Sequence, residues 1–299
     1  MTDPNWTRAS SWLGGEHAEA LIATLQLIGA PVRLGSISGG RFDLTPPAAR
    51  AALDRFSTFD GEVDVRAVRV RDAGDLAVAE KTPEEARDEI AGAIGGSLAH
   101  SDAVLLLGGD NSITRPGVRG MGPDLERIGL VTLDAHHDLR DTGDGLSNGN
   151  PVRALLEDGL PGRNIVQIGI QPFANSQAYA RVAADAGIAV MTASDVREVG
   201  IAEAMGEALR RLAELDAIYV DLDVDVLDRA FAPACPGSRP GGLAPSDLQR
   251  AARMCGEEPK VRALDIVEVD PERDVAEATV MTVASLVLSF AAGLVRRNA

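Results

Sequence analysis

The stretch Ile128–Asp138, IGLVTLDAHHD, decides the fold. An uncharged, mostly apolar run is followed at once by a turn with two carboxylates and two imidazoles. Such a run, closed by a polar turn, is typical of a strand buried on both faces of a parallel sheet. In open sheets of this kind, ligands bind outside the carboxyl ends of the strands. The stretch therefore predicts both a doubly covered strand and a functional turn after it.

The same rhythm of apolar run, polar turn and amphipathic stretch recurs along the chain. We expect strands at Ala23–Ile28, Val65–Val70, Ala103–Leu107, Ile128–Leu133, Ile165–Ile170, Ala189–Met191, Ala217–Leu222 and Val261–Val267. We expect helices at Pro83–Leu98, Gln177–Ala186, Ile201–Ala213, Pro245–Met254 and Ala276–Arg296. This alternation predicts an α/β fold with a mostly parallel central sheet. No linker divides it, so we expect an N-terminal extension at residues 1–20 and a single domain at residues 21–299.

The charge and cysteine content of the chain exclude several classes of function. The 299 residues carry 29 basic and 45 acidic side chains, a formal net charge of −16. Such acidity argues against a nucleic acid or an anionic membrane as partner. Two cysteines are too few for a disulfide framework, and the start MTDPNWTRASSW lacks the pattern of a signal peptide, so we expect a cytoplasmic protein. The apolar run Met281–Val295 is shorter than the roughly 20 residues that span a bilayer, and indicates a buried C-terminal helix.

Three predicted strands end in turns rich in polar side chains: GGDNS at 108–112, DAHHD at 134–138 and DLDVDVLD at 221–228. In an extended segment residues i and i+2 point the same way, so Asp134, His136 and Asp138 can converge, and so can Asp223 and Asp225. Four carboxylates packed together would repel one another, and a divalent cation removes that repulsion. This ligand set suits Mn²⁺ better than a structural zinc, and it can bridge two ions about 3.5–4 Å apart.

The alternative interpretation of any single D-x-D is a solvated turn or a helix cap. Two independent acidic strand ends, one with an imidazole, favour the metal site. The four histidines of the chain, His17, His100, His136 and His137, exclude a site that needs three imidazoles in one loop. His137 alternates with His136 in direction, so we expect it to be structural.

Taken together, GGDNS, DAHHD, DVDVLD at 223–228 and EVDP at 268–271 resemble the ureohydrolase family, which includes arginase, agmatinase, guanidinobutyrase and formimidoylglutamase. The resemblance runs in order from about Leu27 to the C-terminus and includes DAGD at 72–75, FAP at 231–233 and PGGL at 240–243. It implies a three-layer α/β/α arginase-like fold with two Mn²⁺ ions. It also implies a homo-oligomer, since trimers and hexamers are common in the family.

The resemblance implies six metal ligands: Asn111, Asp134, His136, Asp138, Asp223 and Asp225. Asp134 and Asp223 would bridge both ions. Asn111 and Asp138 would complete the ligands of one ion, and the remaining two residues those of the other. Glu268 would receive the cationic amidine or guanidine of the substrate. Asp138 would also carry a proton to the leaving amine, because a general acid is needed to expel it.

Two departures from the family separate its branches. Asn111 stands where most members have histidine, and an amide oxygen is a weaker ligand, so one ion is expected to bind less tightly. Asn148 stands where arginase and agmatinase have a histidine that is thought to shuttle protons, and an amide cannot titrate. Both departures resemble the formimidoylglutamase branch. The expected reaction is hydrolysis of N-formimidoyl-L-glutamate to L-glutamate and formamide, a step of histidine degradation.

This substrate has two carboxylates, so its pocket should offer guanidinium groups. Arg153 is the first candidate, with Arg41 and Arg115 as others, and Asn148 is also expected to contact the substrate. One alternative is a urea-releasing hydrolase of the agmatinase, guanidinobutyrase or arginase type. A second is a metal-binding pseudoenzyme or scaffold, which only Asn111 favours. The roles of Asp221, in place of a small polar residue, and of Cys235 stay open.

Overall fold

The structure of the protein is a computed structural model that describes residues 5–297. Within these residues eight strands form one sheet in the order β2-β1-β3-β8-β7-β4-β5-β6, and all neighbouring strands are parallel. The strands are β1 Ala23–Ala30, β2 Val68–Asp75, β3 Ala103–Gly108, β4 Ile128–Leu133, β5 Ile165–Ile170, β6 Ala189–Thr192, β7 Ala217–Asp223 and β8 Val261–Val267. The helices are α1 Ala9–Leu13, α2 Thr45–Ala52, α3 Pro83–Leu98, α4 Thr114–Gly120, α5 Pro151–Glu157, α6 Gln177–Ala186, α7 Ala193–Val199, α8 Ile201–Arg211, α9 Pro245–Glu257 and α10 Ala278–Arg296.

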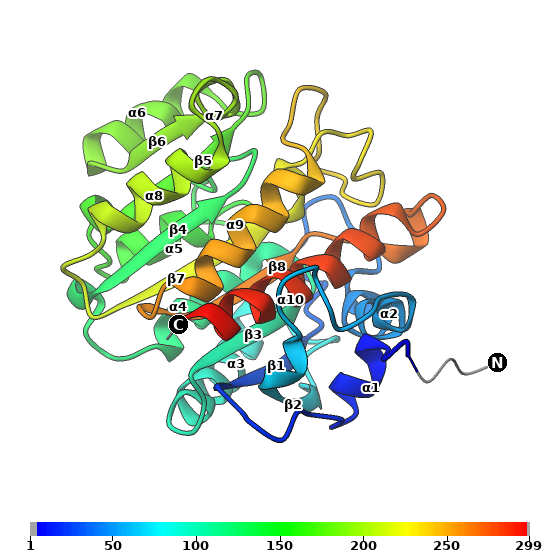
Figure 1. Cartoon of the computed structure of the whole chain (residues 1–299). Coiled ribbons are helices and arrows are strands. Elements are labelled where there is room, and N and C mark those ends of the chain that lie inside the picture. Colours follow the sequence, from blue (N-terminus) through cyan, green and yellow to red (C-terminus); the bar gives the residue numbers. More distant parts are fainter. Residues whose placement is uncertain (1–4, 298–299) are drawn as a thin grey trace.

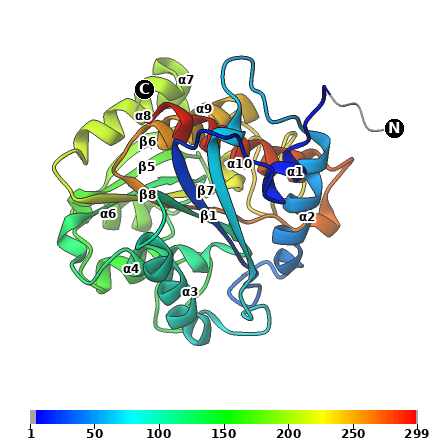
Figure 2. The same cartoon turned by 60° about the horizontal axis from the view of Figure 1, so that its bottom comes forward.

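Helices cover both faces of the sheet. One apolar cluster joins the strands to α1, α2 and α7–α10, and a second joins them to α3–α6. Successive strand residues belong to opposite clusters: Leu105 of β3 faces the first, and Leu106 faces the second. Figure 2 shows α3 and α4 on one side of the strands and α9 and α10 on the other. The three-layer arrangement confirms the predicted fold class and explains why the strands are apolar throughout.

The predicted strands and helices recur with small changes at their ends. The exception is the expected strand Val65–Val70: its first three residues form a 3₁₀ turn, and β2 instead runs on to Asp75. The Asp64 carboxylate accepts the Arg66 N–H at 3.0 Å and so favours the turn over an extended start. The short helices α1, α2, α4, α5 and α7 have no counterpart among the predicted helices, because five to eight residues hold too little periodicity to detect.

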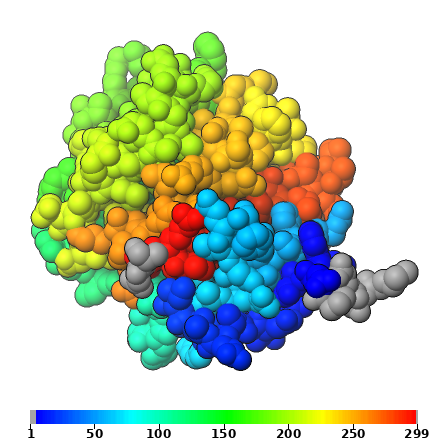
Figure 3. All heavy atoms as spheres, in the orientation of Figure 1, coloured from blue at the N-terminus to red at the C-terminus, as the bar shows by residue number. Residues whose placement is uncertain are grey.

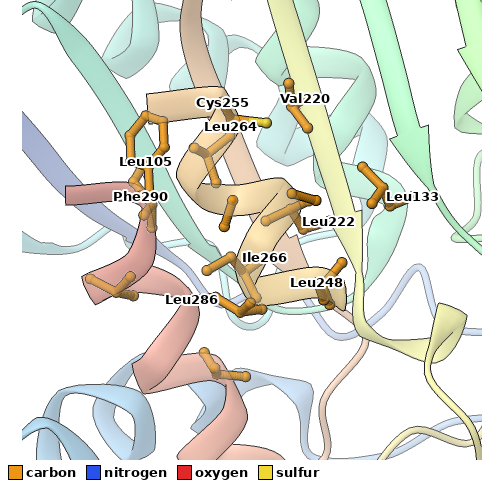
Figure 4. Packing of buried hydrophobic residues seen from close by; sticks show 14 of the residues in the cluster. Leu105, Leu133, Val220, Leu222, Leu248, Cys255, Leu264, Ile266, Leu286 and Phe290 are labelled. Atoms are coloured by element: carbon orange, nitrogen blue, oxygen red, sulfur yellow. The ribbon is translucent and has the colours of Figure 1, made fainter. Parts of the chain in front are cut away.

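The C-terminal helix α10 is a core element. By length and composition it could cross a membrane, but 67% of its apolar window is buried inside the protein. It packs along α9, and Figure 4 shows Leu286 and Phe290 of α10 near Leu248 and Cys255 of α9, in front of the strands of the sheet. On the face in Figure 3 the red helix is visible only in part, between orange atoms of α9 and the cyan segment before β2. The predicted buried helix is therefore present.

The N-terminal segment packs on the domain. Trp12 of α1 is fully buried and donates its indole N–H to the Val68 carbonyl at 2.8 Å. Figure 1 places α1 beside α2, next to β2. The boundary at residue 20 stays a prediction, and residues 1–4 and 298–299 of the two expected segments lie outside the described residues.

Two glycines allow α9 and α10 to approach each other. A Cβ on Gly293 would lie 2.1 Å from the Arg253 carbonyl oxygen and 2.7 Å from the Gly256 Cα, both backbone atoms that cannot yield. Gly293→Ala should therefore lower the free energy of unfolding by about 1–3 kcal/mol, as overpacking does. Gly92→Ala is the matched control: its Cβ meets nothing within 4 Å, and it should stabilise α3 by about 0.5–1 kcal/mol. Urea unfolding of both variants measures the difference, and equal midpoints would contradict the argument.

Candidate metal centre

The candidate site lies at the carboxyl ends of β3, β8, β7 and β4, four adjacent strands in the middle of the sheet. Asn111 follows β3, Glu268 follows β8, Asp223 ends β7, and Asp134 follows β4. Although β3 and β4 are consecutive in the chain, β8 and β7 lie between them in the sheet. In α/β proteins such a change in strand order leaves a crevice at the carboxyl ends of the strands, where ligands bind. Side chains distant in sequence are thereby brought to one edge.

Hydrogen bonds with Ile168 of β5 and with Asn175 hold the turn after β4 in place. The Asp134 N–H donates to the Ile168 carbonyl at 3.0 Å, and the Asn175 amide bridges the turn, accepting from His137 N–H at 2.8 Å and donating to the Ala135 carbonyl at 2.9 Å. His137 itself is buried, and its Nδ1 lies 2.7 Å from Gln167 Oε1, away from the crevice. His136 is thus left to point toward the carboxylates.

Two site residues have left-handed backbone conformations. Asp138 has φ 53° and Glu268 has φ 67°, values that cost energy for residues other than glycine. The Glu268 N–H donates to the Gly109 carbonyl at 3.0 Å, and the Arg153 N–H donates to the Asp138 carbonyl at 3.0 Å. These bonds hold each strained residue in place. Both carboxylates therefore face the crevice instead of continuing the direction of the preceding segment.

The GGDNS turn at 108–112 is hydrogen-bonded to the Glu268 carboxylate through Asn111. Asp110 is fully buried and accepts the Gly35 and Ser112 N–H groups at 2.9 and 3.0 Å, which shapes the turn. Glu268 Oε1 then accepts the Asn111 backbone N–H at 2.8 Å and the Asn148 side-chain N–H at 2.9 Å. Asn111 also approaches Asp138, with Nδ2 to Oδ2 at 2.6 Å. The two asparagines thus lie in the site that the sequence predicts for them.

Asp223 and Asp225 meet His136 from the neighbouring strand. The His136 Nδ1 lies 2.9 Å from Asp225 Oδ2 and 3.4 Å from Asp134 Oδ1. Asp223 accepts the Asp225 N–H at 2.8 Å through Oδ1, and Gly237 packs so closely that a Cβ there would lie 2.0 Å from Asp225 Oδ2. Only glycine therefore fits beside the Asp225 carboxylate.

The electrostatics of the site are those of crowded, buried carboxylates. Asp134, Asp138, Asp223, Asp225 and Glu268 are each at most 6% exposed. Burial and neighbouring charge raise the pKa of Asp134 to about 6 and that of Glu268 to about 8, and the pKa values of Asp138 and Asp223 well above their ordinary range. Protonated carboxyl groups are how a protein tolerates such crowding without a cation.

His136 is the counterpart of that acidity. The Asp225 carboxylate beside its ring raises the pKa of His136 to about 12, and the resulting imidazolium lowers the pKa of Asp225. One ligand atom each of Asp134, His136 and Asp225 lie within 4.8 Å of one another. A donor set of one imidazole and several carboxylates with raised pKa values fits a divalent metal of the Mn²⁺ type.

A cavity of about 140 Å³ opens above these ligands. Its walls include His136, Asp138, Asn148, Asp223, Asp225 and Glu268, and also Arg140, Arg239, Asn175 and Tyr179. Of the residues predicted for the substrate, Asn148 and Glu268 line it. The predicted arginines lie elsewhere in ion pairs: Arg153 with Glu157 at 2.7 Å, Arg41 with Asp43 at 2.8 Å and Arg115 with Asp158 at 2.7 Å.

The sequence interpretation missed Arg140 and Arg239 as cavity residues. Arg140 stands two positions after Asp138, but the left-handed backbone of Asp138 interrupts the alternation on which the i, i+2 rule depends. Arg239 lies in an irregular loop, where its Nη1 donates to the Gly237, Ser238 and Pro236 carbonyls at 2.6, 3.2 and 3.3 Å. No periodicity marks such a position.

The two residues left open have buried positions. Cys235 is fully buried and its pKa is raised well above the ordinary value by burial and by Asp225, so it is a neutral thiol and not a nucleophile. Asp221 of β7 lies opposite Asp265 of β8 in the sheet, two positions before the proposed metal ligand Asp223. Burial and the Asp265 carboxylate raise the pKa of Asp221 well above its usual range.

Comparison with known proteins places this geometry in a family. The model described as the Arginase family matches residues 23–293. The formimidoylglutamase of Halalkalibacterium halodurans is 38% identical over 274 residues, which cover 89% of this chain and 86% of that protein. The crystal structure of Bacillus subtilis formimidoylglutamase superposes with a TM-score of 0.90 at 31% identity, over 98% of this chain and 94% of that one.

A more distant likeness concerns the fold. The crystal structure of Trypanosoma cruzi formiminoglutamase with Mn²⁺ has a TM-score of 0.86 at 24% identity, over 98% of this chain and 99% of that one. The family match, the sequence relatives and the strand-end carboxylates all agree with the family that the four sequence motifs indicate. The chain belongs to the arginase family.

Proposed function

We propose that the protein is a Mn²⁺-dependent formimidoylglutamase, which hydrolyses N-formimidoyl-L-glutamate to L-glutamate and formamide. The sequence relatives of that name, at 38% and 34% identity over most of the chain, support this activity. The observation that carries the substrate assignment is Arg140. It lines the cavity with the metal-ligand carboxylates, and among residues 5–297 its guanidinium has no hydrogen-bond or ion-pair partner.

The local structure positions the Arg140 side chain so that its guanidinium is not used in an ion pair within residues 5–297. Its backbone N–H donates to the Gly149 carbonyl at 3.1 Å, and its side chain lies across Gly149, where a Cβ would be 2.6 Å from Cδ. Gly149 follows Asn148, so the guanidinium lies beside the amide that holds Glu268. A guanidinium in this position suits a substrate carboxylate, which it can bind by two parallel charge-assisted hydrogen bonds. Guanidino substrates without a carboxylate, such as agmatine, leave it unpaired.

Two Mn²⁺ ions fit the donor set, and Mn²⁺ in the related Trypanosoma cruzi structure supports this choice of metal. When bound, such ions lower the pKa of water and so supply a nucleophile at neutral pH. We assign Asn111, Asp134, His136, Asp138, Asp223 and Asp225 as their ligands. Of the oxygen ligands in this set only Asn111 is neutral, and its ion is expected to bind less tightly.

The residues of the chain account for the remaining steps. Glu268 orients the cationic amidinium by a charge-assisted hydrogen bond, while the Asn111 and Asn148 N–H groups hold its carboxylate in place. The leaving amine departs only after protonation, and Asp138 is the buried carboxylate in the cavity wall that can take the proton of the nucleophile and deliver it. Asn148 has no proton to exchange. We further propose a homo-oligomer, by analogy with the family.

The alternative is a urea-releasing guanidino hydrolase. A substrate panel with Mn²⁺ decides: N-formimidoyl-L-glutamate, agmatine, 4-guanidinobutyrate and arginine, with formamide and urea assayed separately. We expect formamide from the first compound and no urea from the other three. Urea release from any of them at a higher kcat/KM than formamide release would replace the proposed substrate. Full Mn²⁺ occupancy without turnover of any compound would favour the scaffold.

Arg140→Met should raise KM for N-formimidoyl-L-glutamate by roughly 10–100-fold, because a hydrogen bond to a charged group contributes about 1.5–3 kcal/mol. Turnover of N-formimidoyl-propylamine, which has the same amidine and no carboxylate, should not change. Arg153→Met is the matched control: it removes a nearby arginine that pairs with Glu157, and it should change neither value. Should Arg153→Met alone raise KM, the carboxylate site would belong to Arg153.

Asp138→Asn should lower turnover at least about a hundredfold, the size of a general acid–base contribution. Asparagine tolerates the φ of 53° at this position, so the backbone should not change. Elemental analysis of the same sample separates proton transfer from metal loss. Near-normal turnover with both ions bound would show that another group carries the proton.

Binding of Mn²⁺ should stabilise the protein more as the pH rises from 7 to 8.5. In EDTA, burial and the neighbouring carboxylates raise the pKa values of the ligands Asp138 and Asp223, so the folded chain binds more protons than the unfolded chain. Each such proton lowers the free energy of unfolding by about 1.4 kcal/mol per pH unit. Mn²⁺ displaces the protons and removes this loss. Thermal unfolding with EDTA and with excess Mn²⁺ gives two curves against pH, and parallel curves would contradict the assignment.

A further inference from the structure

The side chain of Asn111 has two faces in two different environments. Its Nδ2 lies 2.6 Å from Asp138 Oδ2, on the cavity side. Its Oδ1 lies 2.6 Å from the hydroxyl of Thr114, at the start of α4. That hydroxyl is also 2.8 Å from Asp265 Oδ2, deep in the sheet. All four side chains are buried, three of them at 1% exposure or less.

The hydrogens in this chain cannot satisfy every contact at once. Thr114 has one hydroxyl hydrogen, and both neighbours, Asn111 Oδ1 and Asp265 Oδ2, are acceptors when Asp265 is ionised. Asp265 Oδ2 also accepts the Tyr219 hydroxyl at 2.7 Å, which already donates its only hydrogen. With its hydrogen directed at Asp265, Thr114 presents only lone pairs to Asn111. The amide group that can meet lone pairs is Nδ2, not Oδ1.

Turning the Asn111 amide by 180° resolves this conflict with the same heavy-atom positions, because its oxygen and nitrogen are nearly equal in shape. Nδ2 then donates to Thr114, and Thr114 donates to Asp265. Oδ1 faces Asp138 Oδ2 at the distance that Nδ2 has now, 2.6 Å. Two oxygens so close repel each other unless a proton or a cation lies between them, and Mn²⁺ takes the place of that proton when it binds. That arrangement is the one in which Asn111 and Asp138 share a metal ion.

We propose that Thr114 and Asp265 are positioning residues of the metal centre, which direct the Asn111 amide oxygen toward the ion that Asp138 also binds. The proposal rests on the proposed function, in which Asn111 is a ligand. Neither residue touches the substrate cavity, since neither is among its lining residues. Their effect is a fixed direction of hydrogen bonds: Asn111 to Thr114 to Asp265. Outer partners of metal ligands commonly change metal affinity by about 10–100-fold when they are removed.

The test is Mn²⁺ affinity of the full-length protein, measured by titration with electron paramagnetic resonance detection of free Mn²⁺. Thr114→Val removes the hydroxyl at constant shape and should weaken one of the two ions by about 10–100-fold. Thr114→Ser keeps the hydroxyl and should bind both ions as the parent protein does. Asp265→Asn should weaken the same ion, because its amide can donate to Thr114 and so turn the hydroxyl hydrogen toward Asn111.

Two comparisons make the test specific. Asn111→Ala should weaken the same ion, and the double variant Asn111→Ala with Thr114→Val should be no weaker, since Thr114 acts only through Asn111. Thr132→Val is the matched control: this buried threonine lies in the same row of the sheet, its hydroxyl has no partner within residues 5–297, and its removal should leave both affinities unchanged. Thermal unfolding verifies that each variant folds.

The outcomes separate the two proposals. Parent-like affinity in Thr114→Val together with a weakened ion in Asn111→Ala overturns the positioning role and leaves the proposed function intact. Parent-like affinity in Asn111→Ala shows that Asn111 is no ligand, which overturns that part of the metal assignment and the inference with it. An equal loss in Thr114→Val and Thr132→Val also overturns the inference, because the cause would then be a general disturbance of the core.

Discussion

Mutual repulsion among buried carboxylates is the constraint on which the site depends. Five acidic side chains, each at most 6% exposed, meet at the ends of four adjacent strands. Burying an unpaired charge costs several kcal/mol, so a fold that gathers them needs protons or cations to offset it. His136 Nδ1 lies 2.9 Å from the Asp225 carboxylate. Two divalent ions would supply four positive charges, which makes the cluster understandable as a metal centre.

Two residues of this site have strained backbone conformations. Asp138 and Glu268 both have positive φ values, and both carry carboxylates into the cavity. Strain of about 1–3 kcal/mol at such positions persists only where the surroundings determine the conformation. Here the surroundings are a doubly covered parallel sheet whose central strands are fully buried. The rigid sheet therefore makes the precise placement of charged groups possible.

Two asparagines position the Glu268 carboxylate in the site. Asn111 and Asn148 both donate N–H groups to the Glu268 carboxylate, one from the backbone and one from the side chain. Glu268 is thus held in place at the cavity, and in the proposed function it receives the cationic amidine while Asp138 carries the proton. Arg140 and Arg239 line the same cavity and supply positive charge in a protein of net charge −16. An amidine with a carboxylate tail, as in the proposed substrate, matches a cavity with charges of both signs.

Local patterns in the sequence determined much of this protein. Apolar runs located the eight strands, since a strand covered on both faces must be apolar throughout, and the i, i+2 spacing of Asp134, His136 and Asp138 indicated a common direction. The tertiary structure alone decided which arginine faces the cavity: Arg153 pairs with Glu157 within its own helix, whereas Arg140 remains without a partner. It also brought Asp265 to the hydroxyl of Thr114, 151 positions away, which in turn contacts the Asn111 amide. Ion pairs and hydrogen-bond direction depend on neighbours across the sheet, and a linear pattern holds no information about those neighbours.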